Sequence, residues 1–288
     1  MNDSLPPCLV IGARGMLGHD LCAALNALGT NITGIDLPEI DISILSSVKS
    51  IFEKVKPKLV INVAALTDVD GCETQKEAAF KVNANGPENL AIVGKDMGLF
   101  LVHISTDYVF DGSNNRPYKE DDLPNPLGVY GKSKLEGEVR LTKVLSQNYC
   151  IIRTQWLYGK NGRNFVDTII GAGQKNKTLN IVKDQYGSPT YTKDLSTAII
   201  KLCAMKATGV FHVTNSGFTT WSNFASKIFA LVGINDVEIQ DIDTQRLGRP
   251  APRPLYSVLD NSKFERFTGM KLPHWENAIQ KYLLGRKV

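Results

Sequence analysis

The chain of 288 residues has the length of one large domain or two interlocked domains, enough to bury a core without disulfides. Apolar residues make up 43% and charged residues 22% of it, which excludes disordered, collagen-like and low-complexity proteins. Thirty-three basic and 29 acidic side chains give a net charge of +4, too small to predict a nucleic-acid partner. No apolar stretch approaches the roughly 18 residues of a membrane span, so we expect no membrane partner.

The five cysteines are scattered without a CxxC pair, and the four histidines show no metal-ligand spacing. We therefore expect reduced, mostly buried thiols, and no metal site is indicated, although dependence on Mg²⁺ stays open. The N-terminal residues lack the basic start and long apolar core of a signal peptide, so we predict a cytoplasmic protein. No coiled-coil seam is present, and both a monomer and a homodimer stay open.

Apolar runs alternate with amphipathic segments along the first half of the chain. Strands are predicted at residues 9–11, 32–35, 59–65 and 100–104, and helices at 17–28, 48–55 and 90–97. Continuously apolar strands that alternate with helices indicate a Rossmann-type α/β fold, a doubly wound parallel sheet covered on both faces. Ligands bind such sheets at the carboxyl ends of the strands. After about residue 155 the alternation loosens, which predicts a smaller C-terminal α/β lobe across this ligand edge.

Gly12, Gly15 and Gly18 follow the first predicted strand and open the first predicted helix. Glycines at such a turn let the backbone approach a pyrophosphate, whose charge is held by amides at the helix N-terminus. The spacing alone is weak evidence, but the strand before it and the helix after it predict a dinucleotide site. The candidate cofactor-binding residues of this turn also include Arg14, Met16 and Leu17.

Two carboxylates after the second predicted strand are candidates for the adenosine end of the cofactor. Asp36 could hold the ribose hydroxyls and would repel a 2′-phosphate, which favours NADH, whereas Arg14 favours NADPH. The preference between NADH and NADPH therefore stays open, and a simple turn is the other interpretation of Asp36. Asp41 and Ile42 are expected to flank the adenine, unless Asp41 only starts the next helix.

Tyr130 and Lys134 share one face of a helix predicted over residues 130–142. A cation about 4 Å from a phenol is worth about 4 kcal/mol at an effective dielectric of 20 and lowers the phenol pKa by roughly three units. The pair therefore predicts proton transfer near neutral pH. A P-loop at Gly131-Lys132-Ser133 is excluded, because Pro126 stands where that motif needs a glycine.

Thr106 follows the strand at 100–104, at the edge where ligands are expected. Its hydroxyl can bridge a substrate oxygen and Tyr130. Asp107 is either a ligand contact or the cap of the turn, and residues 108–110 are expected to pack rather than to react.

At this point the chain resembles the dTDP-4-dehydrorhamnose reductase family of extended short-chain dehydrogenases/reductases, over nearly its whole length. The resemblance is carried, in order, by the glycine turn, 105–110 (Ser-Thr-Asp-Tyr-Val-Phe), 130–134 (Tyr-Gly-Lys-Ser-Lys), 153–158 (Arg-Thr-Gln-Trp-Leu-Tyr), 184–190 (Asp-Gln-Tyr-Gly-Ser-Pro-Thr), and Arg253-Pro254 ahead of 257–260 (Ser-Val-Leu-Asp). The chain departs from the family pattern at Gln155 and Leu66.

The resemblance implies reduction of the C4 ketone of dTDP-4-dehydro-β-L-rhamnose to dTDP-L-rhamnose by NADPH or NADH. Tyr130 would donate the proton, Lys134 would hold the nicotinamide ribose, and Thr106 would orient the ketone. Asn83 either braces the site or ends a helix, and Trp156 walls the sugar pocket unless it is a core residue. The remaining implied contacts are Ala64, Ala65 and Thr67 for the cofactor and Asp107, Trp156, Asn164 and Arg253 for the nucleotide sugar.

The resemblance also implies a division of the chain, with residues 1–155 and about 190–214 forming the NAD(P)-binding Rossmann domain. Residues 156–189 and 215–288 would form the substrate-binding lobe. Two other functions stay open: another nucleotide-sugar reductase, epimerase or dehydratase of the superfamily, and a non-catalytic subunit resembling the regulatory subunit of methionine adenosyltransferase. The intact Ser-Thr-Asp element beside Tyr130 and Lys134 favours catalysis.

The positive charge is concentrated at the start of the predicted substrate lobe. Residues 151–183 carry six basic side chains and one acidic side chain, a net +5, so the rest of the chain sums to −1. A basic rim raises the local concentration of a diphosphate, which both implied ligands carry.

Overall fold

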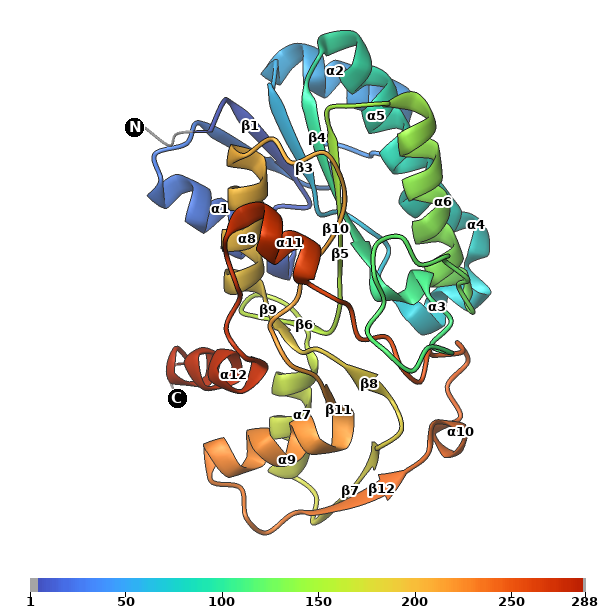
Figure 1. Ribbon diagram of the computed structural model, residues 1–288, viewed down its shortest axis with the longest axis vertical. Coiled ribbons are helices and arrows are strands. Elements are labelled where there is room, and N and C mark those ends of the chain that lie inside the picture. Colours follow the sequence, from blue (N-terminus) through green and yellow to red (C-terminus); the bar gives the residue numbers. More distant parts are fainter. Residues whose placement is uncertain (1–4, 287–288) are drawn as a thin grey trace.

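The computed structural model describes residues 5–286, and its larger lobe is built on a six-stranded sheet (Figure 1). The strand order is β2-β1-β3-β4-β5-β10, and each neighbouring pair is parallel. This confirms the Rossmann-type prediction. The strands are β1 (Cys8–Ile11), β2 (Ile32–Ile35), β3 (Leu59–Asn62), β4 (Phe100–Thr106), β5 (Tyr149–Thr154) and β10 (Gly209–His212).

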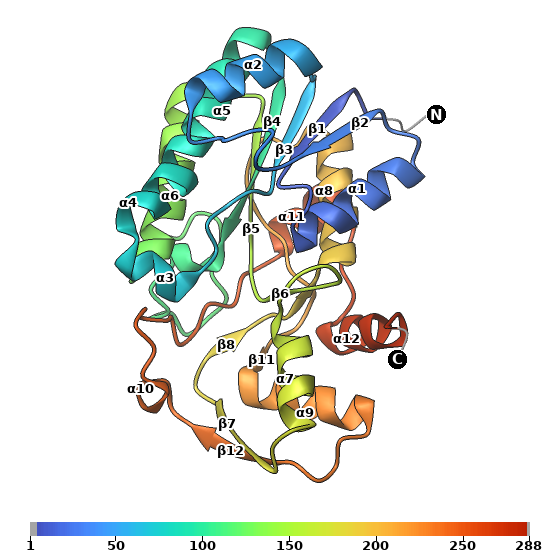
Figure 2. The same cartoon turned by 180° about the vertical axis from the view of Figure 1, so that it is seen from behind.

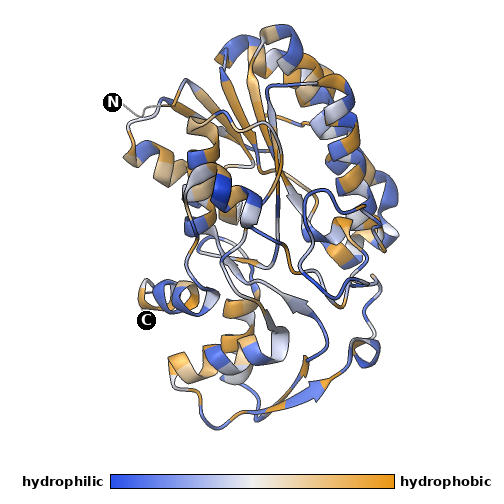
Figure 3. Cartoon of the chain, in the orientation of Figure 1, coloured by the Kyte–Doolittle hydropathy of each residue, from blue (hydrophilic) through white to orange (hydrophobic). Residues whose placement is uncertain are grey.

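Helices cover both faces of this sheet, as Figure 2 shows from behind. One layer contains α1 (Met16–Ala27), α8 (Thr192–Ala204) and α11 (Ser262–Thr268), and the other α2 (Leu45–Val55), α5 (Gly86–Met97) and α6 (Val129–Val144). Within β1, Val10 packs into the first layer, while Leu9 and Ile11 pack into the second. Both faces are thus apolar (Figure 3), which explains the continuous apolar strands in the sequence.

The strand predicted at 59–65 ends early, at Asn62. The Asn62 side chain accepts a hydrogen bond from the backbone N–H of Ala64, at 3.1 Å, and so turns the chain out of the sheet. Short elements follow on the ligand edge: α3 (Val69–Thr74), α4 (Lys76–Phe80), a π-helical turn (Lys81–Asn85) and, after β4, a 3₁₀ turn (Asp107–Val109).

The smaller lobe is built from short paired strands and packed helices. Its core contains Val166, Phe224, Ile228 and Ile279. Its elements are β6 (Leu157–Tyr158), α7 (Phe165–Gly173), β7 (Thr178–Val182), β8 (Tyr186–Gly187), β9 (Thr190–Tyr191), β11 (Thr219–Thr220), α9 (Trp221–Val232), β12 (Glu238–Ile242), α10 (Thr244–Leu247) and α12 (Trp275–Leu284).

The division of the chain at 1–155 with 190–214, against 156–189 with 215–288, stays a prediction. One helix that it assigns to the smaller lobe, α11, places Phe264 in the core of the larger lobe. Within residues 5–286, no helix is both long and apolar enough to cross a membrane.

Candidate active site

A cavity of about 710 Å³ opens at the carboxyl ends of β1, β3, β4 and β5 and reaches the smaller lobe. The chain passes from β1 to β2 on one side and then crosses back to β3 on the other side of β1, and ligands bind at such a switch point. Most of the residues predicted for the site line this cavity: Gly12, Gly15, Met16, Leu17, Gly18, Asp36, Asp41, Ile42, Ala64, Ala65, Thr67, Thr106, Asp107, Tyr130, Lys134 and Trp156.

The glycine turn has the shape that a pyrophosphate requires. Gly12 has a φ of +87°, and a Cβ there would lie 2.7 Å from the backbone N of Ala64. A Cβ on Gly18 would lie 2.1 Å from the Gly12 carbonyl oxygen, so only glycine lets α1 pack against the turn. Gly15 caps α1 without a side-chain hydrogen bond, which leaves the helix amides facing the cavity mouth. The turn therefore fits a dinucleotide.

The predicted adenosine contacts are held by local bonds. Asp36 accepts hydrogen bonds from the backbone N–H groups of Arg14 and Leu37, at 3.2 and 2.9 Å. The Arg14 guanidinium turns outward to the Leu37 carbonyl and to Glu39, and Arg14 does not line the cavity. Asp41 accepts from Ser43 in a turn ahead of α2 and lines the cavity, but the cap of α2 is Ile44, so Asp41 does not cap the helix.

Asn83 braces the loop that follows β3. Its amide accepts from Leu66 N at 2.8 Å and donates to the Leu66 carbonyl at 3.0 Å. The same amide nitrogen donates to Ser133 Oγ on α6, at 3.1 Å. Asn83 lies in the π-helical turn, and it ties the cofactor side of the cavity to the helix that carries Tyr130 and Lys134.

Tyr130 and Thr106 line the same wall of the cavity. Desolvation raises the pKa of the Tyr130 phenol above its usual value, an effect that the nearby Thr106 hydroxyl only partly offsets. Tyr108, expected only to pack, stands edge-on to the Tyr130 ring with centroids 5.6 Å apart and lines the cavity too. The Thr106 hydroxyl donates to Asp107 Oδ1 at 3.0 Å and accepts from the N–H of Tyr108. Burial raises the pKa of Asp107 to about 6.

The predicted lowering of the Tyr130 pKa by Lys134 is wrong for the free protein. Lys134 lies on α6 as expected, but its Nζ donates to the Ile104 carbonyl at 2.6 Å and meets His103 Nε2 at 3.4 Å. Because the Lys134 ammonium turns toward β4, the largest effect on the Tyr130 phenol is its burial, which raises the phenol pKa. Burial also lowers the pKa of Lys134 itself, to about 8.

The smaller lobe contributes a pair of stacked indoles. Trp156, with a φ of +48°, lies parallel to Trp221 with ring centroids 3.6 Å apart, and both line the cavity. Thr154, at the end of β5 beside Thr106, also lines it, and within residues 5–286 its buried Oγ1 has no hydrogen-bond partner. Trp221 lies outside every motif of the sequence analysis, and Thr154 belongs to the 153–158 motif but is not among the predicted site residues. An orphaned hydroxyl and two flat apolar faces suit a polar ring-bearing ligand.

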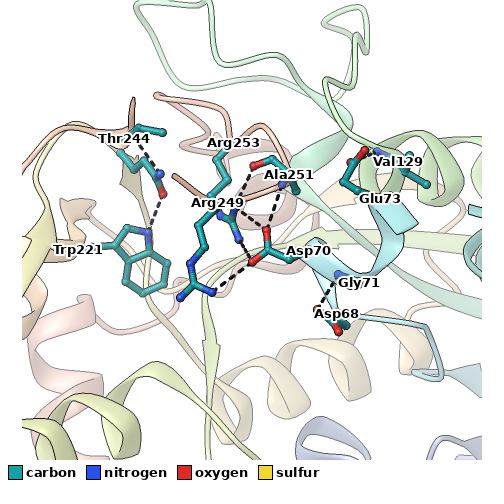
Figure 4. Close-up of polar contacts among 11 residues, drawn as sticks. Asp68, Asp70, Gly71, Glu73, Val129, Trp221, Thr244, Arg249, Ala251 and Arg253 are labelled. Atoms are coloured by element: carbon teal, nitrogen blue, oxygen red, sulfur yellow. Dashed lines mark hydrogen bonds and ion pairs between the residues drawn. The ribbon is translucent and has the colours of Figure 1, made fainter. Parts of the chain in front are cut away.

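Two residues predicted to contact the nucleotide are engaged elsewhere. Asn164 caps α7: its Oδ1 accepts from Asp167 N at 3.0 Å, its amide donates to Gly159 O, and it does not line the cavity. Arg253 forms a two-pronged ion pair with Asp70 on α3, at 3.0 Å for both bonds, and Arg249 joins the same carboxylate (Figure 4). Asp70 also accepts from Ala251 N, so it fastens residues 249–253 to the larger lobe.

The basic segment 151–183 does not form one rim. Arg153 is buried in an ion pair with Glu138, and Lys177 pairs with Asp236 on the surface. Arg163 is the basic residue of this segment that lines the cavity. Within residues 5–286, no group of three or more His, Cys, Asp or Glu side chains comes together as a metal site.

The parallel sheet, the glycine turn and the Thr106–Tyr130–Lys134 group define an oxidoreductase of the short-chain dehydrogenase/reductase class. A family model described as "RmlD substrate binding domain" matches residues 7–286. The chain belongs to this family.

Several relatives match nearly end to end. A Bacillus subtilis spore coat polysaccharide biosynthesis protein, SpsK, is 40% identical, with 96% of this chain and 97% of that protein covered. A dTDP-4-dehydrorhamnose reductase of Streptomyces griseus is 39% identical, with 95% and 92% covered. The crystal structure of the Bacillus anthracis dTDP-4-dehydrorhamnose reductase in complex with NADP is 36% identical, with a TM-score of 0.94 and 98% and 100% covered.

Proposed function

We propose that the protein reduces the C4 ketone of dTDP-4-dehydro-β-L-rhamnose to dTDP-L-rhamnose, with NADPH or NADH as the reductant. The observation that carries the proposal is the placement of Thr106 and Tyr130 on the wall of the cavity that begins at the glycine turn. Bound in that cavity, the reduced cofactor supplies a hydride.

Thr106 and Tyr130 orient the ketone oxygen and supply the proton. In the free protein the Thr106 hydroxyl donates a hydrogen bond to Asp107. Rotation about Cβ–Oγ lets it donate to a ketone oxygen instead. The raised pKa of Tyr130 keeps its phenol protonated at neutral pH, as a proton donor must be. The alkoxide formed at C4 is a much stronger base than a phenolate, so the transfer from Tyr130 is downhill.

The substrate lobe supports the proposal through the Trp156–Trp221 stack, which offers a flat apolar wall to a sugar or a base. Asn164 and Arg253 serve this reaction by shaping the lobe: Asn164 caps α7, and Arg253 holds residues 249–253 against Asp70. In this proposal the cavity residues of the larger lobe contact the cofactor, and the Trp156–Trp221 pair contacts the nucleotide sugar.

Loss of NAD(P)H absorbance on addition of dTDP-4-dehydro-β-L-rhamnose tests the function, with the unepimerised 4-keto sugar nucleotide as the comparison substrate. Tyr130→Phe should lower turnover by about 10²- to 10⁴-fold, because the proton donor is lost. Tyr149→Phe, at the far end of β5, is the matched control and should keep the native rate. An epimerase or dehydratase would convert the sugar nucleotide without net consumption of NAD(P)H, and a regulatory subunit would show no turnover. An unchanged rate for Tyr130→Phe would refute the mechanism.

A further inference from the structure

A buried row of polar side chains runs from the cofactor loop to Lys134. Asn62 Oδ1 accepts from Ala64 N at 3.1 Å, and Asn62 Nδ2 lies 3.1 Å from His103 Nδ1. His103 Nε2 in turn lies 3.4 Å from Lys134 Nζ. Asn62, His103 and Lys134 are each at most 1% exposed, so water does not compete for these contacts.

The row fixes which ring nitrogen of His103 carries the proton. The backbone N–H of Ala64 can only donate, so the Asn62 atom that it meets is the oxygen and the atom facing His103 is the NH₂ group. His103 Nδ1 therefore accepts. Burial lowers the pKa of His103 well below its usual value, so the ring is neutral and its proton sits on Nε2.

A donor on His103 Nε2 points at the Lys134 nitrogen, which it can bond only when that nitrogen is an uncharged amine. We propose that Asn62 and His103 are positioning residues that set the protonation state of Lys134 by holding the imidazole in its Nε2–H form. Lys134 then keeps one donated bond, to the Ile104 carbonyl, and releases its proton more readily than a lysine that faces an acceptor. The effect on catalysis rests on the proposed function, whereas the tautomer of His103 follows from the row of contacts alone.

The other charged and titratable groups near Lys134 do not replace this effect. Glu138, one turn further along α6, favours the ammonium form, but its carboxylate is bound by Arg153 from β5 and by Ser105 from β4. Tyr130, on the preceding turn of α6, is neutral because desolvation raises its pKa.

A second buried histidine provides an internal reference. His212 Nδ1 faces the Tyr118 carbonyl at 3.0 Å, and its Nε2 faces Arg153 Nη1 at 3.5 Å. A carbonyl requires a donor and a guanidinium requires an acceptor, so His212 carries its proton on Nδ1, the opposite of His103.

Nitrogen-15 NMR of the histidine rings in the free full-length protein tests the geometry, because protonated and bare ring nitrogens resonate far apart. The chain has four histidines, and His103→Gln and His212→Gln assign the two signals. The expected result is Nε2–H for His103 and Nδ1–H for His212. Asn62→Asp, which still accepts from Ala64, should switch His103 to Nδ1–H. A native His103 with its proton on Nδ1 would overturn the proposal even if the variant did not fold.

The pH profile of turnover tests the effect on Lys134. In Asn62→Asp, the unprotonated Nε2 of His103 and the added negative charge both favour the ammonium form of Lys134. The pH above which turnover falls should therefore move up by roughly one to three units. In His103→Gln, the amide NH₂ can donate in place of Nε2–H. The pH above which turnover falls should therefore stay close to the native value. If Asn62→Asp reverses the His103 tautomer but turnover falls at the native pH, His103 does not control the protonation of Lys134. Absence of turnover in the native protein would refute the proposed function and leave the tautomer result standing.

Discussion

Two buried basic side chains, Arg153 on β5 and Lys134 on α6, are held in opposite ways. Arg153 makes two charge-assisted bonds to Glu138, at 2.6 and 3.0 Å, and its guanidinium lies 5.2 Å from the Phe110 ring centre. Lys134 has a backbone carbonyl and an imidazole, and its Nζ has no carboxylate within salt-bridge distance in residues 5–286. An arginine so paired keeps its charge, whereas a buried lysine without a counter-ion releases its proton readily. The comparison separates a structural ion pair from a group suited to proton transfer.

Lys134→Met should give the largest effect, and on activity alone. We expect turnover to fall at least about 100-fold, since the variant loses the one lysine that lines the cavity beside Tyr130 in residues 5–286. The free energy of unfolding should stay within about 1 kcal/mol of the native value or rise, because a buried charge without a carboxylate is replaced by an apolar chain of similar length. Steady-state kinetics and urea unfolding check both parts. A large loss of stability would erase the distinction from Arg153.

Glu138→Gln should act on stability. Removing the carboxylate leaves Arg153 buried and uncompensated, which costs about 3–5 kcal/mol of unfolding free energy. Urea unfolding measures this loss. Glu136→Gln on the same helix breaks a partly exposed pair with Arg140 and should cost no more than about 0.5 kcal/mol. Equal losses in the two variants would contradict the assignment of Arg153 as a structural ion pair.

His212→Gln should have the smallest effect, a change in the pH dependence of stability. Burial, with the Arg153 charge, lowers the pKa of His212 to about 3, so below pH ~6.5 the unfolded chain binds a proton that the folded chain does not. Stability is lost as the pH falls, by about 1.4 kcal/mol per unit from this group. The variant should therefore lose about 2 kcal/mol less than the native protein between pH 6.5 and 5. Identical slopes in urea unfolding would show that His212 is protonated in the fold.

Asp107 acts in the opposite direction over part of this range. Its pKa is raised to about 6, so the folded protein takes up that proton first and gains stability relative to the unfolded chain as the pH falls. Asp107 contributes equally in the native protein and in His212→Gln. The difference between their pH dependences of unfolding free energy therefore reports His212 alone.

The sequence predicts the larger lobe well because period and composition report burial directly. Strands β1, β2 and β4 and helices α1, α2 and α5 lie where the apolar pattern places them, and α6 lies where the Tyr130–Lys134 pair expects a helix. The early end of β3 could not be predicted that way, because the Asn62 side chain competes locally for the backbone of Ala64.

The site was predicted less evenly. Residues of the glycine turn and of 105–110 follow strands, so topology alone carries them to one edge. The cap role of Asn164 is readable in the sequence, since Asn followed three residues later by Asp in an apolar run is typical of a helix start. Trp221 and His103 reach the site through long-range packing, which spacing does not encode. The turn of Lys134 toward β4 likewise depends on a buried carbonyl that no sequence pattern reveals.

The stacked indoles have an optical consequence. The chain has three tryptophans, and two of them, Trp156 and Trp221, form a near-parallel pair at an interplanar angle of 12° in the cavity wall. Transitions of two aromatic chromophores so close couple and produce a paired near-ultraviolet circular dichroism band. The third, Trp275, is buried in the core of the smaller lobe and gives a constant background. A molecule that slides along or parts the pair therefore changes the spectrum without any label, and the protein reports the occupancy of its own cavity.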